Sequence, residues 1–238
     1  MQNSQDSNAA TFTWVWENQR FSMPVGKEDI LQLARAVEHE GYPEVGVAWA
    51  LIQRTAWLWS HGMRFNLGRL VTAYAQPINP LWFPGGKKHD EEMARLSKLG
   101  DAAGQLNESS RALARVSKAA TPWGEISSKT KKVIADILNN LSTSPVLGAV
   151  HYWKSHGMTF AENQAARPTL VLMDKGYGFG PGRNVFFAES KSGGFGGISV
   201  LNGSKAWPGE TQNVAGVGDA GKIVLAAALG YFAWRYFL

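Results

Sequence analysis

Residues 33–54 have the sequence Leu-Ala-Arg-Ala-Val-Glu-His-Glu-Gly-Tyr-Pro-Glu-Val-Gly-Val-Ala-Trp-Ala-Leu-Ile-Gln-Arg. Apolar residues recur at positions 30, 33, 34 and 37 and again at 45, 47, 48, 51 and 52, which is the spacing of a buried helix face. Gly41-Tyr42-Pro43 separates the two groups and stops the first helix. The stretch therefore predicts two consecutive buried helices, with Glu38 and Glu40 at the end of the first.

A carboxyl group at such a helix end suits acid catalysis. When apolar neighbours cover it partly, the group loses hydration, its charged form is disfavoured and its pKa rises. It can then donate a proton near neutral pH. Cleavage of a glycosidic bond needs a group of this kind to protonate the leaving oxygen.

The order of residues in this stretch resembles the cell wall hydrolase family that includes the spore-cortex-lytic transglycosylases. The shared features are Leu33-Ala34-Arg35, two apolar residues, an acid before a turn, and an apolar helix that closes on Gln53-Arg54. The family pattern places its catalytic glutamate at Glu40. The turn is several residues shorter here, so Glu38 stays open as the alternative.

Three later segments resemble the same family in the same order, and the likeness covers residues 26–190. Residues 74–82 are similar to the loop after the second helix in phage members, residues 148–152 to the segment that enters the second half of the domain, and residues 182–189 to the closing strand. We expect the substrate-binding residues to lie in these segments, with Trp82 as an aromatic platform for a sugar ring and His151 and Tyr152 lining the cleft through their polar tips. The full set is Gln76, Asn79, Trp82, His151, Tyr152, Asn184 and Glu189.

The resemblance implies an α+β fold of lysozyme-like character, mainly helical with a small antiparallel sheet. It implies a peptidoglycan lytic transglycosylase or muramidase that uses a single glutamate as general acid and base, without a cofactor or metal. Hydrolysis instead of transglycosylation requires a second carboxylate. The candidates for that role are Glu44, Asp174 and Glu189.

The charge and the aromatic content of the chain indicate which classes of binding partner suit it. The 238 residues carry a net charge of +5, and they include ten tryptophans and six tyrosines. A basic protein favours an acidic partner, and aromatic rings suit sugar faces or a membrane interface. We expect no specific nucleic-acid recognition, because the basic residues are scattered and no recognition motif accompanies them. Without cysteine, disulfides and cysteine nucleophiles are excluded.

Periodicity and turn residues predict the remaining elements. Residues 12–16 alternate and predict a strand or an aromatic lid, whereas 77–84 predict an irregular loop. We expect helices over 66–74, 87–107, 110–118 and 129–141, and strands over 170–173 and 184–187 joined by a glycine-rich loop. That loop lacks the lysine and hydroxyl residues of a P-loop, so we do not expect it to bind phosphate.

A zinc site at His151, His156 and Asp174 is disfavoured. The five-residue interval between the histidines misses the usual metal-ligand spacings, and no cysteine completes a set. His61, near the end of the second helix, is expected to stabilise that helix end instead of taking part in catalysis.

Four segments are expected along the chain. Residues 1–25 form an N-terminal segment without the pattern of a secretory signal, residues 26–190 the peptidoglycan-cleaving domain, and residues 191–221 a Gly/Ser-rich linker. Residues 222–238 are apolar on all sides and predict a transmembrane or membrane-interacting helix. As a helix, residues 223–238 would span about 24 Å, slightly less than a bilayer core of roughly 30 Å. A buried core helix or an oligomer contact fits the same pattern.

A wall-cleaving enzyme without a secretory signal and with an apolar tail is typical of a phage virion protein. We therefore expect it in the particle, acting on the host cell wall in the periplasm during genome delivery. Its expected partners are peptidoglycan strands, a membrane through residues 222–238, and other virion proteins or further copies of itself. The alternatives are a non-catalytic structural or ejection component, and a zinc peptidase or amidase.

Overall fold

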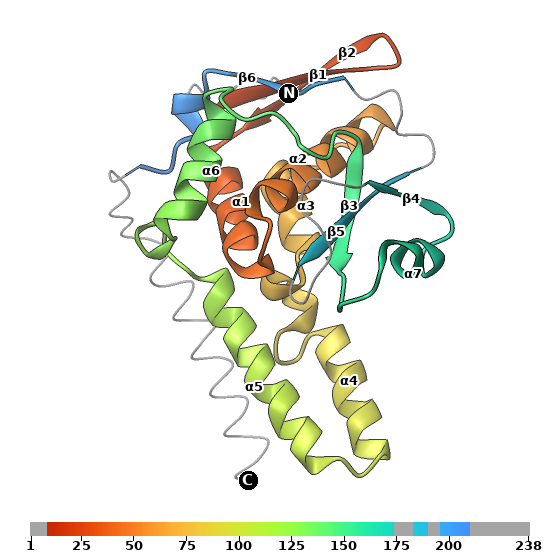
Figure 1. Ribbon diagram of the computed structural model, residues 1–238. Helices are drawn as coiled ribbons and strands as arrows, with labels where there is room; N and C mark the ends of the chain where they lie inside the picture. The colour runs from red at the N-terminus through yellow and green to blue at the C-terminus, as the bar shows by residue number, and fades with distance from the viewer. Residues whose placement is uncertain (1–8, 174–182, 190–195, 210–238) are drawn as a thin grey trace.

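The computed structural model describes residues 9–173, 183–189 and 196–209 (Figure 1). Two consecutive helices lie at the centre, with further helices and two small sheets packed around them. The helices are α1 Lys27–Glu40, α2 Glu44–Ser60, α3 Leu67–Tyr74, α4 Lys87–Lys98, α5 Ala102–Ala119, α6 Ser128–Leu138 and α7 Phe160–Ala165. The strands are β1 Ala10–Trp16, β2 Gln19–Val25, β3 Ala149–Lys154, β4 Leu170–Met173, β5 Asn184–Glu189 and β6 Ser199–Leu201. Short 3₁₀ turns are η1 Gln76–Ile78, η2 Pro80–Trp82, η3 Trp123–Glu125 and η5 Gly203–Ala206.

Both sheets have three strands, and every pairing in them is antiparallel. The first has the order β2-β1-β6 and the second the order β3-β5-β4. The predicted α+β class is confirmed, including the pairing of the two strands expected near 170–173 and 184–187. Their connecting glycine-rich loop lies outside the described residues.

The two predicted central helices are confirmed. α1 buries Leu33 and Val37 completely, as the apolar spacing requires. Asp29 organises its first turn, because one carboxylate oxygen accepts the N–H of Gly26 and the other accepts the N–H of Gly68, both at 2.9 Å. At the other end Gly41 has φ +88°, a conformation that L side chains rarely adopt, so the helix stops there.

β1 settles the choice between a strand and an aromatic lid in favour of a strand. Phe12, Trp14 and Trp16 alternate with more exposed residues and lie in the core. β1 also pairs with both β2 and β6. Residues 10–25 therefore belong to the folded domain, and the expected linker over 191–221 is interrupted by β6 and η5. These three-residue and four-residue elements are stabilised by pairing and packing that local composition does not reveal.

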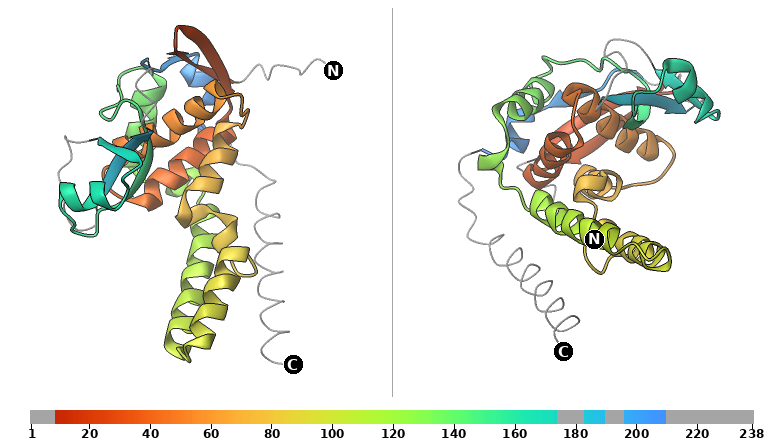
Figure 2. Two further views of the ribbon diagram at one scale, coloured as in Figure 1. Left: turned by 90° about the vertical axis from the view of Figure 1, so that its right-hand side faces the viewer. Right: turned by 60° about the horizontal axis from the view of Figure 1, so that its bottom comes forward.

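The polar segment after residue 86 differs from its predicted boundaries. Instead of a helix to residue 107 and a second after Ser109, the break falls between α4 and α5. Gly100 has φ +69°, and the carboxylate of Asp101 caps α5 by accepting the N–H of Gly104 at 2.7 Å. The two helices lie side by side and extend away from the body as a hairpin (Figures 1 and 2).

Two further helices begin at side-chain caps. Asn66 accepts the N–H of Arg69 before α3, and Ser127 accepts the N–H of Thr130 before α6. α6 ends three residues earlier than predicted. The proline-rich loop over 77–84 contains the two short turns η1 and η2. His61 caps the end of α2, where its Nδ1 donates to the carbonyl of Trp57 at 2.8 Å.

α2 approaches the second sheet closely through Gly46. A Cβ atom at this position would lie 2.5 Å from the ring of Phe186, which is itself buried in β5. Only a glycine allows this separation between the helix and the sheet.

We expect Gly46→Ala to destabilise the protein by about 1–3 kcal/mol, because the methyl group forces the helix and the sheet apart. Chemical denaturation followed by circular dichroism measures this. Gly124→Ala is the matched control, since nothing lies within 4 Å of the point that its methyl group would occupy. Equal stability of the two variants would contradict the proposed close contact.

Candidate active site

Glu40 is the last residue of α1 and points toward the sheet β3-β5-β4. Its Oε1 accepts a hydrogen bond of 2.9 Å from the phenol of Tyr152 on β3. Its backbone carbonyl accepts a hydrogen bond from the ammonium group of Lys154, two residues further along the same strand. Asn184 on β5 donates to the same carbonyl at 3.4 Å. The end of the first central helix is thus fixed by the second sheet.

Burial raises the pKa of the Glu40 carboxyl above its ordinary value. The hydrogen bond from Tyr152, the charge of Lys154 and a hydrogen bond from the backbone N–H of Gln76 lower the pKa, and they oppose the rise only in part. Burial raises the pKa of the Tyr152 phenol far above its ordinary range, so this group remains a neutral donor. Glu40 therefore has the environment of a general acid.

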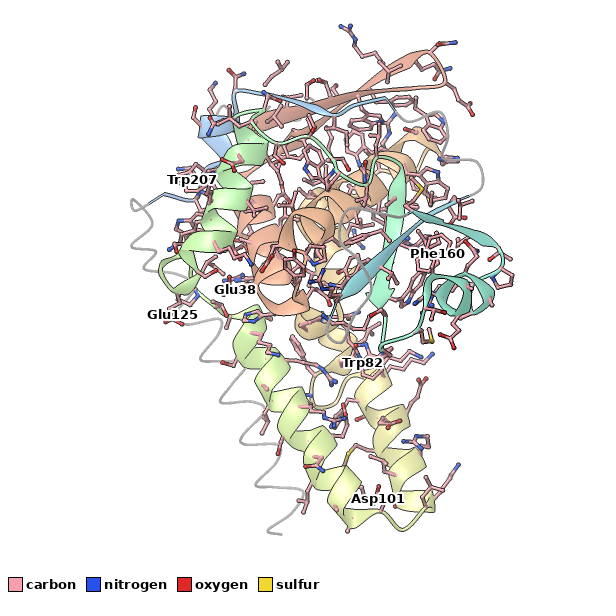
Figure 3. The ribbon with its side chains drawn as sticks, viewed as in Figure 1. Glu38, Trp82, Asp101, Glu125, Phe160 and Trp207 are labelled. Carbon is pink, nitrogen blue, oxygen red and sulfur yellow. The ribbon has the colours of Figure 1, made fainter. Side chains whose placement is uncertain are left out.

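Glu38 has a different environment, although it lies only two positions before Glu40. One of its carboxylate oxygens accepts the Ser127 hydroxyl at 2.7 Å and the Ser127 N–H at 3.3 Å, at the start of α6 (Figure 3). Burial raises the pKa of Glu38, but hydrogen bonds from Ser127 and Thr130 outweigh it and the pKa is lowered. Glu38 is therefore an ionised carboxylate that ties α1 to α6.

A group of polar side chains lies behind Tyr152. Its ring packs edge-on against Tyr74 at 5.6 Å between centroids, and the Tyr74 phenol lies 3.2 Å from His151 Nδ1. The Arg54 guanidinium stacks over the Tyr74 ring at 4.2 Å and lies 2.8 Å from the same ring nitrogen. Glu189 Oε1 lies 2.8 Å from His151 Nε2.

These contacts assign the tautomer of His151. Arginine only donates, so Nδ1 is the acceptor facing Arg54 and Nε2 carries the hydrogen that is donated to Glu189. Burial lowers the pKa of His151, and the charge of Arg54 lowers it further against the opposing effect of Glu189. The imidazole is therefore neutral at pH 7, and both of its nitrogens already have protein partners.

The sequence-predicted substrate residues do not all gather at Glu40. Tyr152 contacts its carboxyl group, and Asn184 contacts its backbone. Gln76 is exposed and contributes its backbone N–H. Asn79 is buried, and its side chain donates to the Ala73 carbonyl at 2.7 Å and accepts the Leu81 N–H at 2.9 Å. Those bonds give Asn79 a structural role in the turn, and its contact with a substrate stays a prediction.

Trp82 lies at the base of the α4–α5 hairpin (Figure 3). The guanidinium of Arg115 covers its ring at 5.1 Å and also donates to its carbonyl at 3.2 Å. One side of this half-buried ring is therefore occupied by the protein itself, and the remainder is the surface it offers to a ligand.

The candidate second carboxylates have basic partners where they are described. Glu44 lies 2.7 Å from Lys129, and Glu189 is the partner of His151. Asp174 lies outside the described residues. Neither described group contacts Glu40, so the site as described contains one carboxyl group with a raised pKa.

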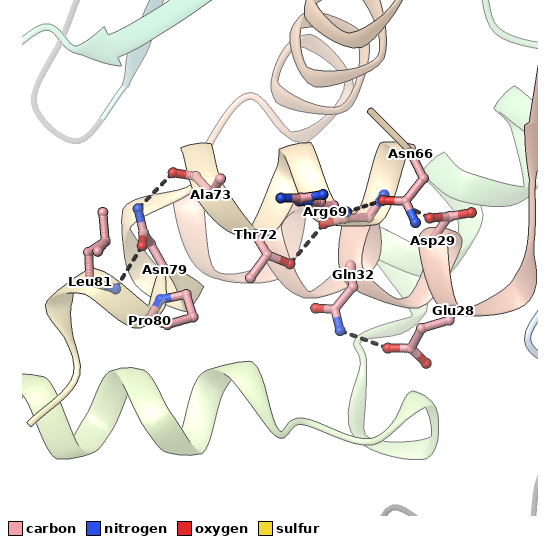
Figure 4. Close-up of a pocket in the computed structure, with 11 residues that line it drawn as sticks. Glu28, Asp29, Gln32, Asn66, Arg69, Thr72, Ala73, Asn79, Pro80 and Leu81 are labelled. Carbon is pink, nitrogen blue, oxygen red and sulfur yellow. Dashed lines mark hydrogen bonds between the residues drawn. The ribbon is translucent and has the colours of Figure 1, made fainter. Parts of the chain in front are cut away.

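A cavity of about 480 Å³ lies between α1, α3 and η2, away from Glu40 (Figure 4). Gln32 and Glu28 line it from α1, where they hydrogen-bond each other at 2.7 Å. Arg69 and Thr72 line it from α3, and Asn79 lies at the end nearer η2. The cavity and the Glu40 surroundings are therefore two separate features of the surface.

Among the residues that the structure describes, no three histidine, aspartate or glutamate side chains are grouped so as to hold a metal ion. No helix within 9–173, 183–189 and 196–209 is long and apolar enough to cross a membrane. The segment 222–238, for which a membrane helix is predicted, lies outside those ranges.

Sequence reasoning missed Arg54 and Tyr74 as parts of the site. Arg54 follows Gln53 at the end of the apolar pattern, and Tyr74 precedes the proline-rich loop, but neither position has a local signature of function. The signal that favours Glu40 over Glu38 was present. Glu40 follows Leu33 by seven residues and Val37 by three, so it continues the buried stripe of α1.

Comparison of this chain with protein-family models, with curated proteins and with solved structures finds no match.

The two glutamates should have opposite effects on stability. The pKa of Glu40 is higher in the folded protein than in the unfolded chain. As pH rises from the unfolded-state pKa through the folded-state pKa, wild type therefore loses stability relative to Glu40→Gln. We expect equal stabilities below about pH 4, where the carboxyl is neutral in both states, and a more stable variant at pH 7. Urea unfolding at several pH values measures the difference.

Glu38→Gln is the matched control. In the folded wild-type protein the pKa of Glu38 is lowered. The ionised Glu38 carboxylate therefore stabilises the fold at pH values above the ordinary pKa of a glutamate, and this contribution is lost as pH falls through the lowered folded-state pKa. The variant should therefore lose about 1 kcal/mol at pH 7 through weaker bonds to Ser127, and less in acid. A Glu40→Gln protein that is less stable than wild type at pH 7 would contradict the assignment.

Proposed function

We propose that the protein is a peptidoglycan-cleaving enzyme of the lytic transglycosylase or muramidase type, with Glu40 as its general acid and base. The observation that carries this proposal is the buried carboxyl of Glu40 with its raised pKa, held by Tyr152 at the junction of α1 and the second sheet. The resemblance of residues 26–190 to the cell wall hydrolases independently selects the same glutamate.

The contacts of Glu40 support a defined orientation of its acidic proton. Tyr152 donates to Oε1, so Oε2 is the oxygen that carries the proton toward a substrate. Lys154 and Asn184 bind the backbone carbonyl of the same residue and hold the helix end in place. A general acid needs this fixed geometry because proton transfer requires a short, aligned path to the leaving oxygen.

In the proposed reaction, Glu40 donates its proton to the glycosidic oxygen between N-acetylmuramic acid and N-acetylglucosamine as the bond from the anomeric carbon breaks. The resulting Glu40 carboxylate then takes the proton of a hydroxyl group of the same muramic residue. That hydroxyl oxygen attacks the anomeric carbon and forms an anhydro sugar. No water is consumed, and Glu40 ends in its starting protonation state, so one carboxyl group suffices.

The arrangement of elements favours a lysozyme-like architecture within the α+β class. A buried helix ends in the acid, and a small antiparallel sheet follows later in the chain and packs against that helix end. The roles of a phage virion protein, of the host periplasm as the site of action, and of a membrane contact through residues 222–238 remain predictions from the sequence.

The decisive experiment is digestion of purified sacculi by the full-length protein, with release of muropeptides identified by mass. We expect anhydro-muropeptides from wild type and a loss of at least about 100-fold in Glu40→Gln, which removes the proton donor. Glu38→Gln should retain activity at a temperature where it remains folded.

The outcomes separate the alternatives. Reducing-end muropeptides carrying one added water would identify hydrolysis and require a second carboxylate or an activated water. Absence of any product from a correctly folded wild type would favour the non-catalytic structural or ejection component. Activity that is lost with a chelator and retained in Glu40→Gln would favour a zinc peptidase.

Tyr152→Phe tests the hydrogen bond to the acid. Because this bond lowers the pKa of Glu40, its removal should raise that pKa further. We expect the basic limb of the pH–activity profile to move to higher pH, since Glu40 then stays protonated longer, while the fold is retained. A profile that does not move, or moves to lower pH, would contradict Glu40 as the acid.

A further inference from the structure

The outer face of α5 carries an apolar stripe that is exposed to solvent. The members from Ala103 to Ser117 follow one another at alternating intervals of three and four residues, which places them on one side of α5. Leu106 is 71% exposed, and Leu99, at the adjoining tip of the hairpin, is 67% exposed. We define the α5 stripe as Leu99, Ala103, Leu106, Ser110, Leu113 and Ser117, all of which are exposed.

The stripe lacks the charged residues that a solvated helix face normally carries. The charges of α5 lie on other sides of the helix, where Glu108 is buried and pairs with Arg115 at 2.7 Å. Leucines alternate with alanine and serine along the stripe. When two helices pair, the small residues of such a repeat allow the two helix backbones to come close, and the leucines fill the spaces between the side chains of the partner helix. This pattern is typical of a helix that packs against a second helix.

The end of the described chain lies beside the C-terminal end of α5. Trp207 packs edge-on against Trp123 at 4.8 Å between ring centroids. Trp123 follows the last residue of α5 by only four positions, and the described residues end at Gly209. The chain therefore continues into residues 210–238 from a point next to the base of the hairpin.

α5 and the apolar segment 222–238 have similar lengths. α5 has 18 residues and is about 27 Å long. The apolar segment 222–238, taken as a helix, would be about 25 Å long. Residues 210–221 can reach up to about 40 Å when extended, which is enough to connect Gly209 to either end of the stripe.

A second copy of the chain is a less suitable occupant. A face about 27 Å long and roughly 10 Å wide offers on the order of 300 Å² per partner, whereas stable interfaces bury about 800 Å² on each side. A tethered segment needs less contact area, because its effective concentration near the stripe is in the millimolar range.

We propose that residues 222–238 pack as a helix along the α5 stripe of the same chain when the protein is in solution. The segment thereby covers the exposed leucines, and the stripe in turn covers part of an apolar tail that would otherwise face water. Binding of this tail to a membrane competes with its binding to α5.

The absence of native cysteine makes a crosslinking test direct. Ser110→Cys is combined in turn with one cysteine at each position from 223 to 234, and the dilute full-length protein is oxidised without lipid. We expect intramolecular disulfides at positions that repeat every three or four residues. Leu106→Arg should reduce the yield at least fivefold and leave the circular dichroism spectrum of the folded domain unchanged, because no described part of the protein covers this side chain.

Two control variants complete the design. Val171→Cys, at an exposed position of β4, replaces Ser110→Cys and should give no disulfide with the tail. Leu201→Arg, at an exposed position of β6, is the control for an added arginine and should leave the disulfide yield unchanged.

Other outcomes overturn the proposal. Disulfide-linked dimers of the protein carrying Ser110→Cys alone, in high yield at low concentration, would assign the stripe to a second copy. Tail cysteines that form no disulfide, react freely with a maleimide, and become protected only with phosphatidylglycerol–phosphatidylethanolamine vesicles would assign the tail to a membrane. Digestion of sacculi by Glu40 is measured separately, so failure here leaves the proposed enzyme activity untouched.

Discussion

The position of the second sheet depends on the buried amide of Gln53. This side chain on α2 is fully buried and donates to the carbonyls of Val146 and Ala149, at 3.2 and 2.9 Å, while it accepts the N–H of Gly148 at 3.1 Å. An unsatisfied buried polar group costs about 1–3 kcal/mol, so the segment that enters β3 has one favourable position. That position brings Tyr152 against the end of α1.

The two glutamates at that helix end lie two positions apart, yet their carboxyl groups have different partners and opposite pKa shifts. Successive residues turn by about 100° on a helix, so Glu38 and Glu40 face nearly opposite sides. Glu38 meets the hydroxyl and N–H of Ser127 and stabilises the fold as an anion. Glu40 meets the buried phenol of Tyr152 and is costly to ionise. This cost of ionisation is the physical basis of the raised pKa of Glu40.

Local patterns in the sequence were sufficient for the central helices and for the stop between them, because these depend on apolar spacing and on the turn residues Gly41 and Pro43. They were insufficient for β6, whose three residues are a strand only through pairing with β1. At the candidate site, apolar spacing places Glu40 on the buried stripe of α1, whereas the choice of Glu40 over Glu38 as the acid came from the family resemblance and stays a prediction. The roles of Asn79, Arg54 and Tyr74 depend on partners that only the folded chain brings within reach.

The pairing of β1 with β6 joins Thr11 to Leu201, nearly the full length of the described chain apart. The ribosome releases Leu201 only after it has added 190 residues beyond Thr11. The central helices and the β1–β2 hairpin are available long before the third strand of their sheet. During that interval one edge of β1, a strand that carries tryptophans on its buried face, has no partner strand. Such an unpaired edge can pair with another chain. The time needed to translate the residues between β1 and β6 therefore sets how long this edge is exposed to aggregation.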